Sequence, residues 1–195
     1  MPSPSARETL PLFPLHTVLL PGAVLGLRVF EPRYLDLVSD CLREGRTFGV
    51  CLILEGEEAG APALPAAVGC EALIEDFGST GEGLLTLRVR GARRFRVHAI
   101  RIHDNGLVLG EVEWCAPEPE DTLAPEHAVL GTVLRAILDQ VGGEHAAADD
   151  ACFDRAAWVG WRLAELLPLP HAQRLALLEE DDPHARLQRI VELVG

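Results

Sequence analysis

The hydrophobic period changes abruptly at Glu31 and Pro32, and this change limits the folds that the chain can adopt. From Val24 to Phe30 the side chains alternate in character, which is typical of a half-buried strand. Pro32 suits the first position of a helix, and Gly45 is placed to end it. Between them one helical face carries the apolar residues Tyr34, Leu35, Val38, Cys41 and Leu42. The sequence therefore predicts a strand that runs directly into an amphipathic helix.

The segments with strand character all lie in the first part of the chain. Around Leu10 to Phe13 the chain is apolar, but Pro11 and Pro14 cannot donate to a ladder, so we expect an edge strand or an irregular segment. Further strands are predicted over residues 48–54, 68–77, 84–90, 94–103 and 107–114. Gly91 is expected to break the run between two of them, and Asn105-Gly106 predicts a hairpin with a type I′ turn. Short strands at such close spacing predict a small, strongly bent sheet or barrel.

Helical periodicity replaces this pattern after Pro117. Apolar residues from Val129 to Val141 cover about half of a helical wheel, which predicts a helix buried in a bundle. Further helices are predicted from a cap at Asp149 or Asp150 to Leu167, from Pro170, and from Pro183 with Asp182 as its cap. We therefore expect an α+β protein with a β-rich subdomain over residues 1–116 and a helical bundle over residues 117–195.

Several blocks of the sequence resemble the amino-terminal, substrate-binding domain of the Lon protease family. They extend from about Leu10 to Leu193 and are Leu10–Pro14, Leu20–Gly22, Phe30–Tyr34, Phe48–Val50, Val68–Cys70, Gly91–Arg96, Leu166–Pro170 and Asp181–Pro183. The most specific block is Phe-Glu-Pro-Arg-Tyr, together with the Leu-Phe-Pro-Leu that precedes it. Its residues Phe30, Glu31, Pro32, Arg33 and Tyr34 are assigned a structural role, in which Arg33 ties the helix to the sheet.

This resemblance implies a PUA-like pseudobarrel followed by a helical bundle, in a stand-alone form without ATPase and peptidase modules. It also implies non-catalytic recognition of a polypeptide, for example as an adaptor for unfolded or damaged proteins. The expected partner is accordingly a polypeptide substrate or a partner protein, with no membrane involved, and the chain is expected to be a monomer or a weak dimer.

The basic residues argue against several catalytic mechanisms. All 17 of them are arginine, so the chain can form neither a phosphate-binding loop with its lysine, nor a Schiff base, nor a Ser–Lys dyad. None of the four serines lies in a Gly-x-Ser-x-Gly motif. We therefore predict that the chain is not an enzyme. A hydrolase with a cryptic Cys–His site stays open as an alternative, because five cysteines and seven histidines are present.

The cysteines and histidines predict neither a metal site nor a cofactor. The cysteines form no Cys-x-x-Cys pair, and Cys41, Cys51 and Cys70 occupy apolar positions, which predicts buried thiols in a reducing cytosol. His98 and His103 are five residues apart on a strand and would point to opposite faces. Without a leader or an apolar run of membrane-spanning length, we expect a soluble, cytoplasmic protein.

A strip of arginines suggests a second alternative function. The formal net charge of −13 argues against nucleic-acid binding by the chain as a whole, because such binding relies on basic surfaces. Arg88, Arg90, Arg94 and Arg96 nevertheless lie close together on strand-like segments. We expect them to pair with acidic loops such as 55–58; the alternative is an anion-binding strip that holds RNA or an acidic peptide.

The expected peptide-binding residues lie in the apolar segment from Leu12 to Leu20 and on a helix near the C-terminus. They are Leu12, Leu15, His16, Leu19, Leu20 and Trp158. The segment could accept an extended peptide by strand addition near a groove between sheet and bundle. Trp158 lies on the polar side of its helix, where an indole is a good contact anchor.

Overall fold

The computed structural model describes residues 7–81 and 83–194. The chain divides into two compact units, the first ending at Ala116 and the second beginning at Pro117. The first unit contains the sheet and one helix, and the second contains the remaining helices, so the α+β class predicted from the sequence is confirmed.

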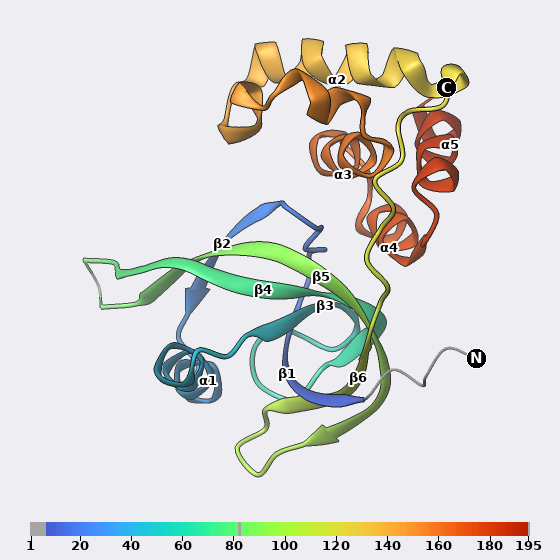
Figure 1. The fold of residues 1–195 in the computed structure, drawn as a ribbon. Helices are drawn as coiled ribbons and strands as arrows, with labels where there is room; N and C mark the ends of the chain where they lie inside the picture. The colour runs from blue at the N-terminus through green and yellow to red at the C-terminus, as the bar shows by residue number, and fades with distance from the viewer. Residues whose placement is uncertain (1–6, 82, 195) are drawn as a thin grey trace. The chain divides into compact units, whose positions relative to one another are not determined.

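The first unit is a strongly bent sheet of six strands with one helix (Figure 1). Its elements are β1 (Glu8–Leu15), β2 (Val24–Val29), α1 (Pro32–Glu44), β3 (Phe48–Glu55), β4 (Leu64–Ser79), β5 (Leu85–Ile102) and β6 (Val108–Trp114). The strand order is β2-β5-β4-β3-β1-β6, and β6 also pairs with β5. Five strands therefore close on themselves as a barrel, while β2 is added to the outside of β5.

The opening strand has a neighbour on each side, although the sequence predicts an edge strand or an irregular segment. Residues Glu8–Leu12 of β1 pair antiparallel with β6, and Leu12–Leu15 pair parallel with β3. The prediction was wrong because it considered only the missing N–H groups of the two prolines. Each half of β1 has a single partner strand, so the prolines are tolerated inside a closed sheet.

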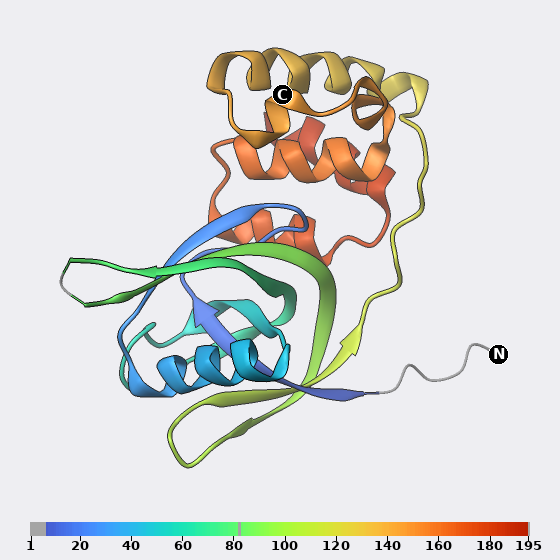
Figure 2. The ribbon, with the colours of Figure 1, turned by 60° about the vertical axis from the view of Figure 1, so that its left-hand side comes forward.

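Strand β5 continues through Gly91, where the sequence predicts a break. Its first half pairs with β2 and β4, and its second half pairs with β6. A Cβ atom on Gly91 would lie 2.1 Å from the carbonyl oxygen of Leu20, so the glycine permits a close approach of two backbones. The pairing on both sides keeps the chain extended, and Figure 2 shows the resulting continuous bend.

The β5–β6 hairpin is confirmed, but its turn is not type I′. That turn needs positive φ at both Asn105 and Gly106, whereas among the described residues only glycines have positive φ. Gly106 has φ 84°, and its N–H donates to the carbonyl oxygen of His103 at 2.8 Å. The loop between His103 and Leu107 is therefore a three-residue connection with glycine at the left-handed position.

Helix α1 begins and ends where the sequence predicts. Pro32 occupies its first turn, and Gly45 caps it with φ 65°. The buried face is rotated from the predicted one: Leu35 and Leu42 are 38% and 44% exposed, while Arg33 and Leu37 are buried with Tyr34, Val38 and Cys41. This face packs against Phe13, Phe48 and Val50 of the sheet. Arg33 on this face has polar partners inside the unit, the carbonyl oxygen of Gly106 and the carboxylate of Glu31.

The second unit is built from α2 (Ala128–Val141), α3 (Ala156–Leu166), α4 (His171–Glu179) and α5 (Pro183–Val194), with short 3-10 turns between them. The cap of α5 is confirmed, since Asp182 Oδ1 accepts from the backbone N–H of His184 at 2.8 Å. The predicted helix from Asp149 or Asp150 is a 3-10 turn over Asp150–Asp154, and α3 begins only at Ala156. Pro170 caps α4 rather than starting it.

Helix α2 is less buried than its pattern predicts. Val129, Val133 and Val141 are 61%, 42% and 62% exposed, and the buried positions are Leu130, Gly131, Leu134 and Leu138. Val129, Val133 and Val141 therefore form an exposed apolar face on α2. Among the described residues, no helix is both long enough and apolar enough to span a bilayer.

A buried ion pair joins the two ends of the second unit. Arg186 on α5 is fully buried and binds the carboxylate of Glu118, with Nη1 3.2 Å from Oε2. The guanidinium carbon lies 3.5 Å from the ring centroid of Trp161, whose indole N–H also donates to Glu118, at 2.9 Å. The last helix thereby holds the first residues of the unit.

Candidate functional site

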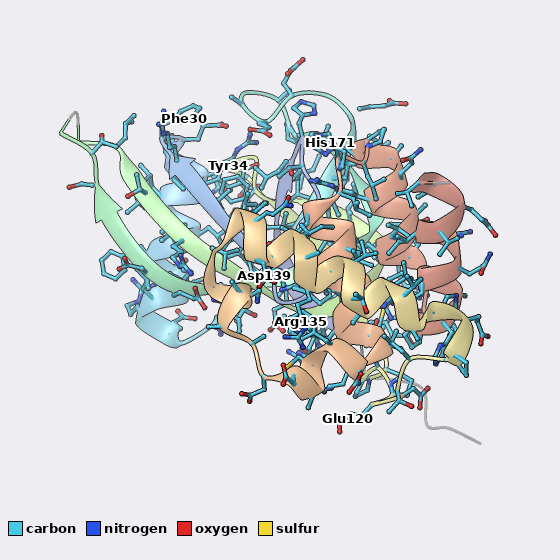
Figure 3. The ribbon with its side chains drawn as sticks, turned by 90° about the horizontal axis from the view of Figure 1, so that it is seen from above. Phe30, Tyr34, Glu120, Arg135, Asp139 and His171 are labelled. Carbon is cyan, nitrogen blue, oxygen red and sulfur yellow. The ribbon has the colours of Figure 1, made fainter. Side chains whose placement is uncertain are left out.

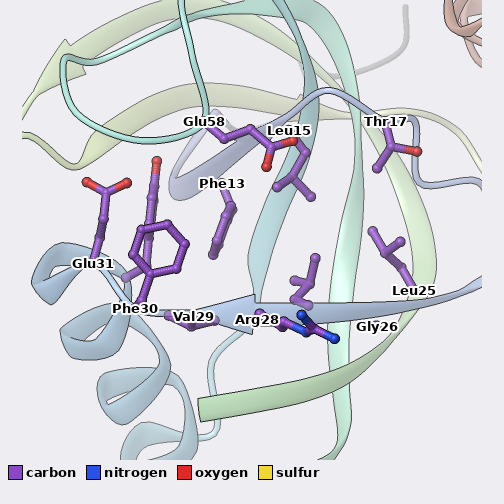
Figure 4. A pocket seen from close by; sticks show the side chains of 12 residues that line it. Phe13, Leu15, Thr17, Leu25, Gly26, Arg28, Val29, Phe30, Glu31 and Glu58 are labelled. Atoms are coloured by element: carbon purple, nitrogen blue, oxygen red, sulfur yellow. The ribbon is translucent and has the colours of Figure 1, made fainter. Parts of the chain in front are cut away.

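A pocket of about 310 Å³ opens on the first unit beside β2. It is lined by the end of β1, by β2, by the start of α1 and by the β3–β4 loop. The lining residues are Phe13, Leu15, Thr17, Leu25, Gly26, Leu27, Arg28, Val29, Phe30, Glu31, Tyr34 and Glu58. Figure 4 shows Phe13 and Leu15 facing β2 across this space. The volume is at the lower end of the range found for small-ligand sites.

Aromatic side chains form one wall of the pocket. The rings of Phe13 and Tyr34 stack with centroids 3.9 Å apart and planes 14° from parallel. Burial raises the pKa of Tyr34, which the neighbouring Arg33 only partly opposes, so its hydroxyl is protonated at neutral pH. Phe30 completes the rim and is 59% exposed, and Figure 3 shows it close to Tyr34. An aromatic ring of this exposure at an apolar pocket suits contact with an apolar ligand group.

Arg33 lies against the Tyr34 ring of the aromatic wall and holds it in place. Its Nη1 donates to the carbonyl oxygen of Gly106 at 2.9 Å, and its Nη2 lies 3.1 Å from the Glu31 carboxylate. Its guanidinium carbon is 4.7 Å from the ring centroid of Tyr34. These contacts tie the first turn of α1 to the β5–β6 hairpin. The ring of Phe30, from the same motif, is exposed to solvent, and the structural role assigned to these residues stays a prediction.

The open side of the pocket carries two carboxylates and one guanidinium. Glu58 Oε1 accepts the backbone N–H of His16 at 2.6 Å, which holds the β3–β4 loop over the pocket. Glu31 also accepts from the N–H of Gly60 at 3.4 Å, and Glu57 lies 3.5 Å from the His16 imidazole. Arg28 lies across the space, on the exposed face of β2. The lip near the loop is therefore acidic.

Of the peptide-binding residues predicted from the sequence, one lines this pocket. Leu15 does so, while Leu12, Leu19 and Leu20 are at most 2% exposed and belong to the core. His16 is exposed beside the pocket. Trp158 lies in the second unit, where its ring packs edge-on against Phe153 at 5.0 Å. Peptide binding by these residues stays a prediction, and the burial of Leu19 makes a charged substitution there a test of folding rather than of binding.

The arginine strip lies on β5, and its first members are paired with β4. Arg88 and Arg90 both bind the carboxylate of Glu75, with the Arg88 Nε 3.0 Å from it. Arg94 is buried, and Arg96 is half-buried. This partner lies on the neighbouring strand, because adjacent antiparallel strands bring side chains on one face opposite each other. The expected pairing with the loop 55–58 stays a prediction. The anion-binding alternative remains a prediction.

Eight pocket residues were not named as site residues from the sequence: Phe13, Thr17, Leu25, Gly26, Leu27, Arg28, Val29 and Glu58. The available signal was Phe30, an aromatic residue between an alternating strand and a helix start. The meeting of β1, β2 and the β3–β4 loop depends on the strand order, which no local pattern contains. Among the described residues, no group of three or more His, Cys, Asp or Glu is arranged to hold a metal ion.

Comparison with known proteins identifies the family. Residues 9–195 match the model of the ATP-dependent protease La (LON) substrate-binding domain, which covers nearly the whole chain. The protein belongs to this family. The resemblance noted in the sequence is therefore confirmed.

Solved structures of Lon N-terminal domains agree with this assignment, and two curated proteins show a weaker similarity. The chain is 56% identical to a Lon N-terminal domain protein from Xanthomonas campestris, with TM-score 0.84 over 96% of this chain and 99% of that one. The N-terminal domain of a Mycobacterium avium complex Lon protease shares the fold, with TM-score 0.69 at 19% identity over 95% of this chain and 97% of that one. Protein cereblon from Danio rerio is 29% identical over 54% of this chain, and that of Gallus gallus 25% identical over 71%. The matches span only 25% and 29% of those two proteins.

Proposed function

We propose that this protein is a non-catalytic recognition module that binds apolar side chains of unfolded or damaged polypeptides in the pocket beside β2. The observation that carries the proposal is Phe30, a 59% exposed aromatic residue on the rim of an apolar pocket. Exposed aromatic residues beside desolvated pockets are typical of the few positions that dominate binding energy. The substrate-binding role of the family supports a polypeptide as the ligand.

The chemistry of the pocket supports binding rather than catalysis. Among its twelve described lining residues, the groups of a nucleophilic type are the hydroxyls of Thr17 and Tyr34 and the carboxylates of Glu31 and Glu58. Both carboxylates are engaged, Glu31 by the Arg33 guanidinium and Glu58 by the backbone N–H of His16. Burial also raises the pKa of Cys41 to about 11 and that of Cys51 to about 12. These thiols are protonated at neutral pH, whereas a nucleophilic cysteine must be a thiolate. This set of side chains fits an adaptor that binds polypeptides and presents them to a separate protease.

The proposal is tested by measuring binding of a permanently unfolded protein. Reduced, carboxymethylated α-lactalbumin carrying fluorescein is titrated with the wild-type protein and with Phe30→Ala, and fluorescence anisotropy reports the affinity. Because a truncated anchor residue costs at least 1–2 kcal/mol, we expect Phe30→Ala to weaken binding about tenfold.

Phe77→Ala is the matched control for this experiment. Phe77 is also 59% exposed, but it lies on β4 outside the pocket. It should bind like the wild type. Equal affinities for the wild type and Phe30→Ala, or equal losses in the two variants, would contradict recognition through this pocket.

A further inference from the structure

The lining of the pocket shows that it follows the edge of β2. Seven consecutive residues, from Leu25 to Glu31, line it. Side chains alternate between the two faces of a strand, so a cavity on one face would meet only every second residue. Here Leu27 and Val29 are buried while Gly26 and Arg28 are exposed, yet all four border the same space. A pocket that meets both faces of a strand lies along its backbone edge.

This edge has no described partner strand. In the described sheet β2 pairs with β5 alone, over the whole length from Val24 to Val29. The end of β1 from Phe13 to Leu15 pairs only with β3, and its Phe13 and Leu15 face β2 across the pocket (Figure 4). Alternate N–H and C=O groups of β2 therefore point toward the pocket instead of a neighbouring strand.

The β2 edge also lacks most of the features that prevent strand addition. Its register with β5 runs without a shift, so no bulge twists the edge away, and the segment from Val24 to Val29 contains no proline. A Cβ atom on Gly26 would meet nothing within 4 Å, so the space beside the middle of the strand is open. Arg28 is the one charged residue within the strand.

We propose that an extended, proline-free polypeptide segment adds to the free edge of β2 as a further strand, with an apolar side chain in the pocket. This inference rests on the proposed function and specifies how the ligand is held. At about 3.3 Å per residue, the edge accommodates about six residues of ligand. Backbone hydrogen bonds supply affinity for many sequences, and the pocket selects one side chain. The carboxylate of Glu58 at the lip favours a basic residue flanking that side chain, whereas Glu31 is already paired with Arg33.

The test uses the peptide Gly-Arg-Leu-Phe-Leu-Arg-Gly, capped at both ends and labelled with fluorescein. A series of peptides carries one N-methyl group on the backbone nitrogen of each internal residue in turn. Only alternate backbone groups of an added strand face its neighbour. We therefore expect affinity to fall about tenfold or more at every second position and to change less than about twofold at the positions between, which act as matched controls.

Hydrogen exchange locates the added strand on the wild-type protein. Saturating peptide should slow the exchange of alternate amides between Val24 and Phe30, while amides at the far end of the β4–β5 hairpin stay unchanged. Suppose that the parent peptide binds and that Phe30→Ala lowers its affinity. If N-methylation then has no alternating effect on affinity, or if the amides of β2 exchange no more slowly with peptide bound, strand addition is wrong and the proposed function stands. If the parent peptide does not bind, or binds Phe30→Ala equally well, both proposals are overturned.

Discussion

Arg33 and Gly106, which are 73 residues apart in the chain, are joined by a hydrogen bond of 2.9 Å from the arginine Nη1 to the glycine carbonyl oxygen. The arginine is 5% exposed, and it also binds Glu31 and lies against the Tyr34 ring. One buried side chain thus connects the start of α1, the turn of the β5–β6 hairpin and the aromatic wall of the pocket.

We expect Arg33→Ala to lower the free energy of unfolding by about 2–4 kcal/mol, because it leaves a carboxylate and a carbonyl group without their partner. Arg43→Ala is the control, since Arg43 makes an exposed pair with Asp40 on the same helix, and it should cost less than about 1 kcal/mol. Urea titrations followed by circular dichroism measure both values. Similar values for the two variants would contradict the role assigned to Arg33.

Two glycines on neighbouring strands provide a second matched pair. A Cβ atom on Gly91 would lie 2.1 Å from the Leu20 carbonyl oxygen, whereas one on Gly26 meets nothing within 4 Å. Gly91→Ala should therefore lower the free energy of unfolding by about 1–3 kcal/mol or more, through the backbone shift that it requires. Gly26→Ala should be neutral or stabilise by up to about 1 kcal/mol, because alanine restricts the unfolded chain. Thermal unfolding of each variant measures these changes. A loss of stability in Gly26→Ala as large as that in Gly91→Ala would contradict the close approach of Gly91 to the Leu20 backbone.

Acid should weaken the first unit through Glu71. Burial raises the pKa of this carboxyl group, but hydrogen bonds from Arg93 and Thr47, 2.8 Å each, outweigh burial and lower the pKa below its ordinary value of 4.5. A group with a lowered pKa in the folded state stabilises the fold above its unfolded pKa, and this stabilisation is lost as pH falls through the folded pKa.

Urea titrations between about pH 6 and about pH 3 should therefore show a steeper loss of stability in the wild type than in Glu71→Gln, which cannot ionise. The glutamine variant should be the less stable protein at neutral pH, since it replaces charge-assisted hydrogen bonds with neutral ones. Parallel pH profiles for the two proteins would show that Glu71 does not contribute to the acid sensitivity.

The acidic lip of the pocket predicts a preference for basic ligands. The peptide with flanking arginines should bind several-fold more tightly than its analogue with flanking glutamates, and added salt should reduce the difference. In Glu58→Gln the preference should shrink, while the amide oxygen can still accept the N–H of His16 that Glu58 now binds. If Glu58→Gln prefers the arginine peptide as strongly as the wild type does, Glu58 does not contribute to the recognition of charged ligand residues.

The features predicted well from the sequence are those that neighbouring residues determine. Pro32 at the start of α1, Gly45 at its end and Asp182 at the cap of α5 satisfy or replace backbone groups within one turn, so their effect is visible locally. The expected break at Gly91 and the type I′ turn failed, because strand pairing and loop length decided them instead.

The pocket could be predicted least. Its walls come from β1, β2 and a loop after β3, and they meet only because β2 is added to the outside of a closed barrel. Leu12 to Leu20 was chosen for its apolar character, and that character instead places Leu12, Leu19 and Leu20 in the core. Apolar composition alone does not distinguish a residue that fills the interior from one that borders an opening.

The ion pair between Arg186 and Glu118 connects the last helix of the helical unit to its first residues. A premature stop codon ahead of Pro183 would remove α5 and with it the cation that neutralises Glu118. The effect would reach the other end of the unit, since the residues that follow Pro117 would lose their contact with α5 and keep the hydrogen bond from Trp161. Truncation at the carboxyl terminus is therefore expected to weaken the packing of the first residues of the helical unit as well.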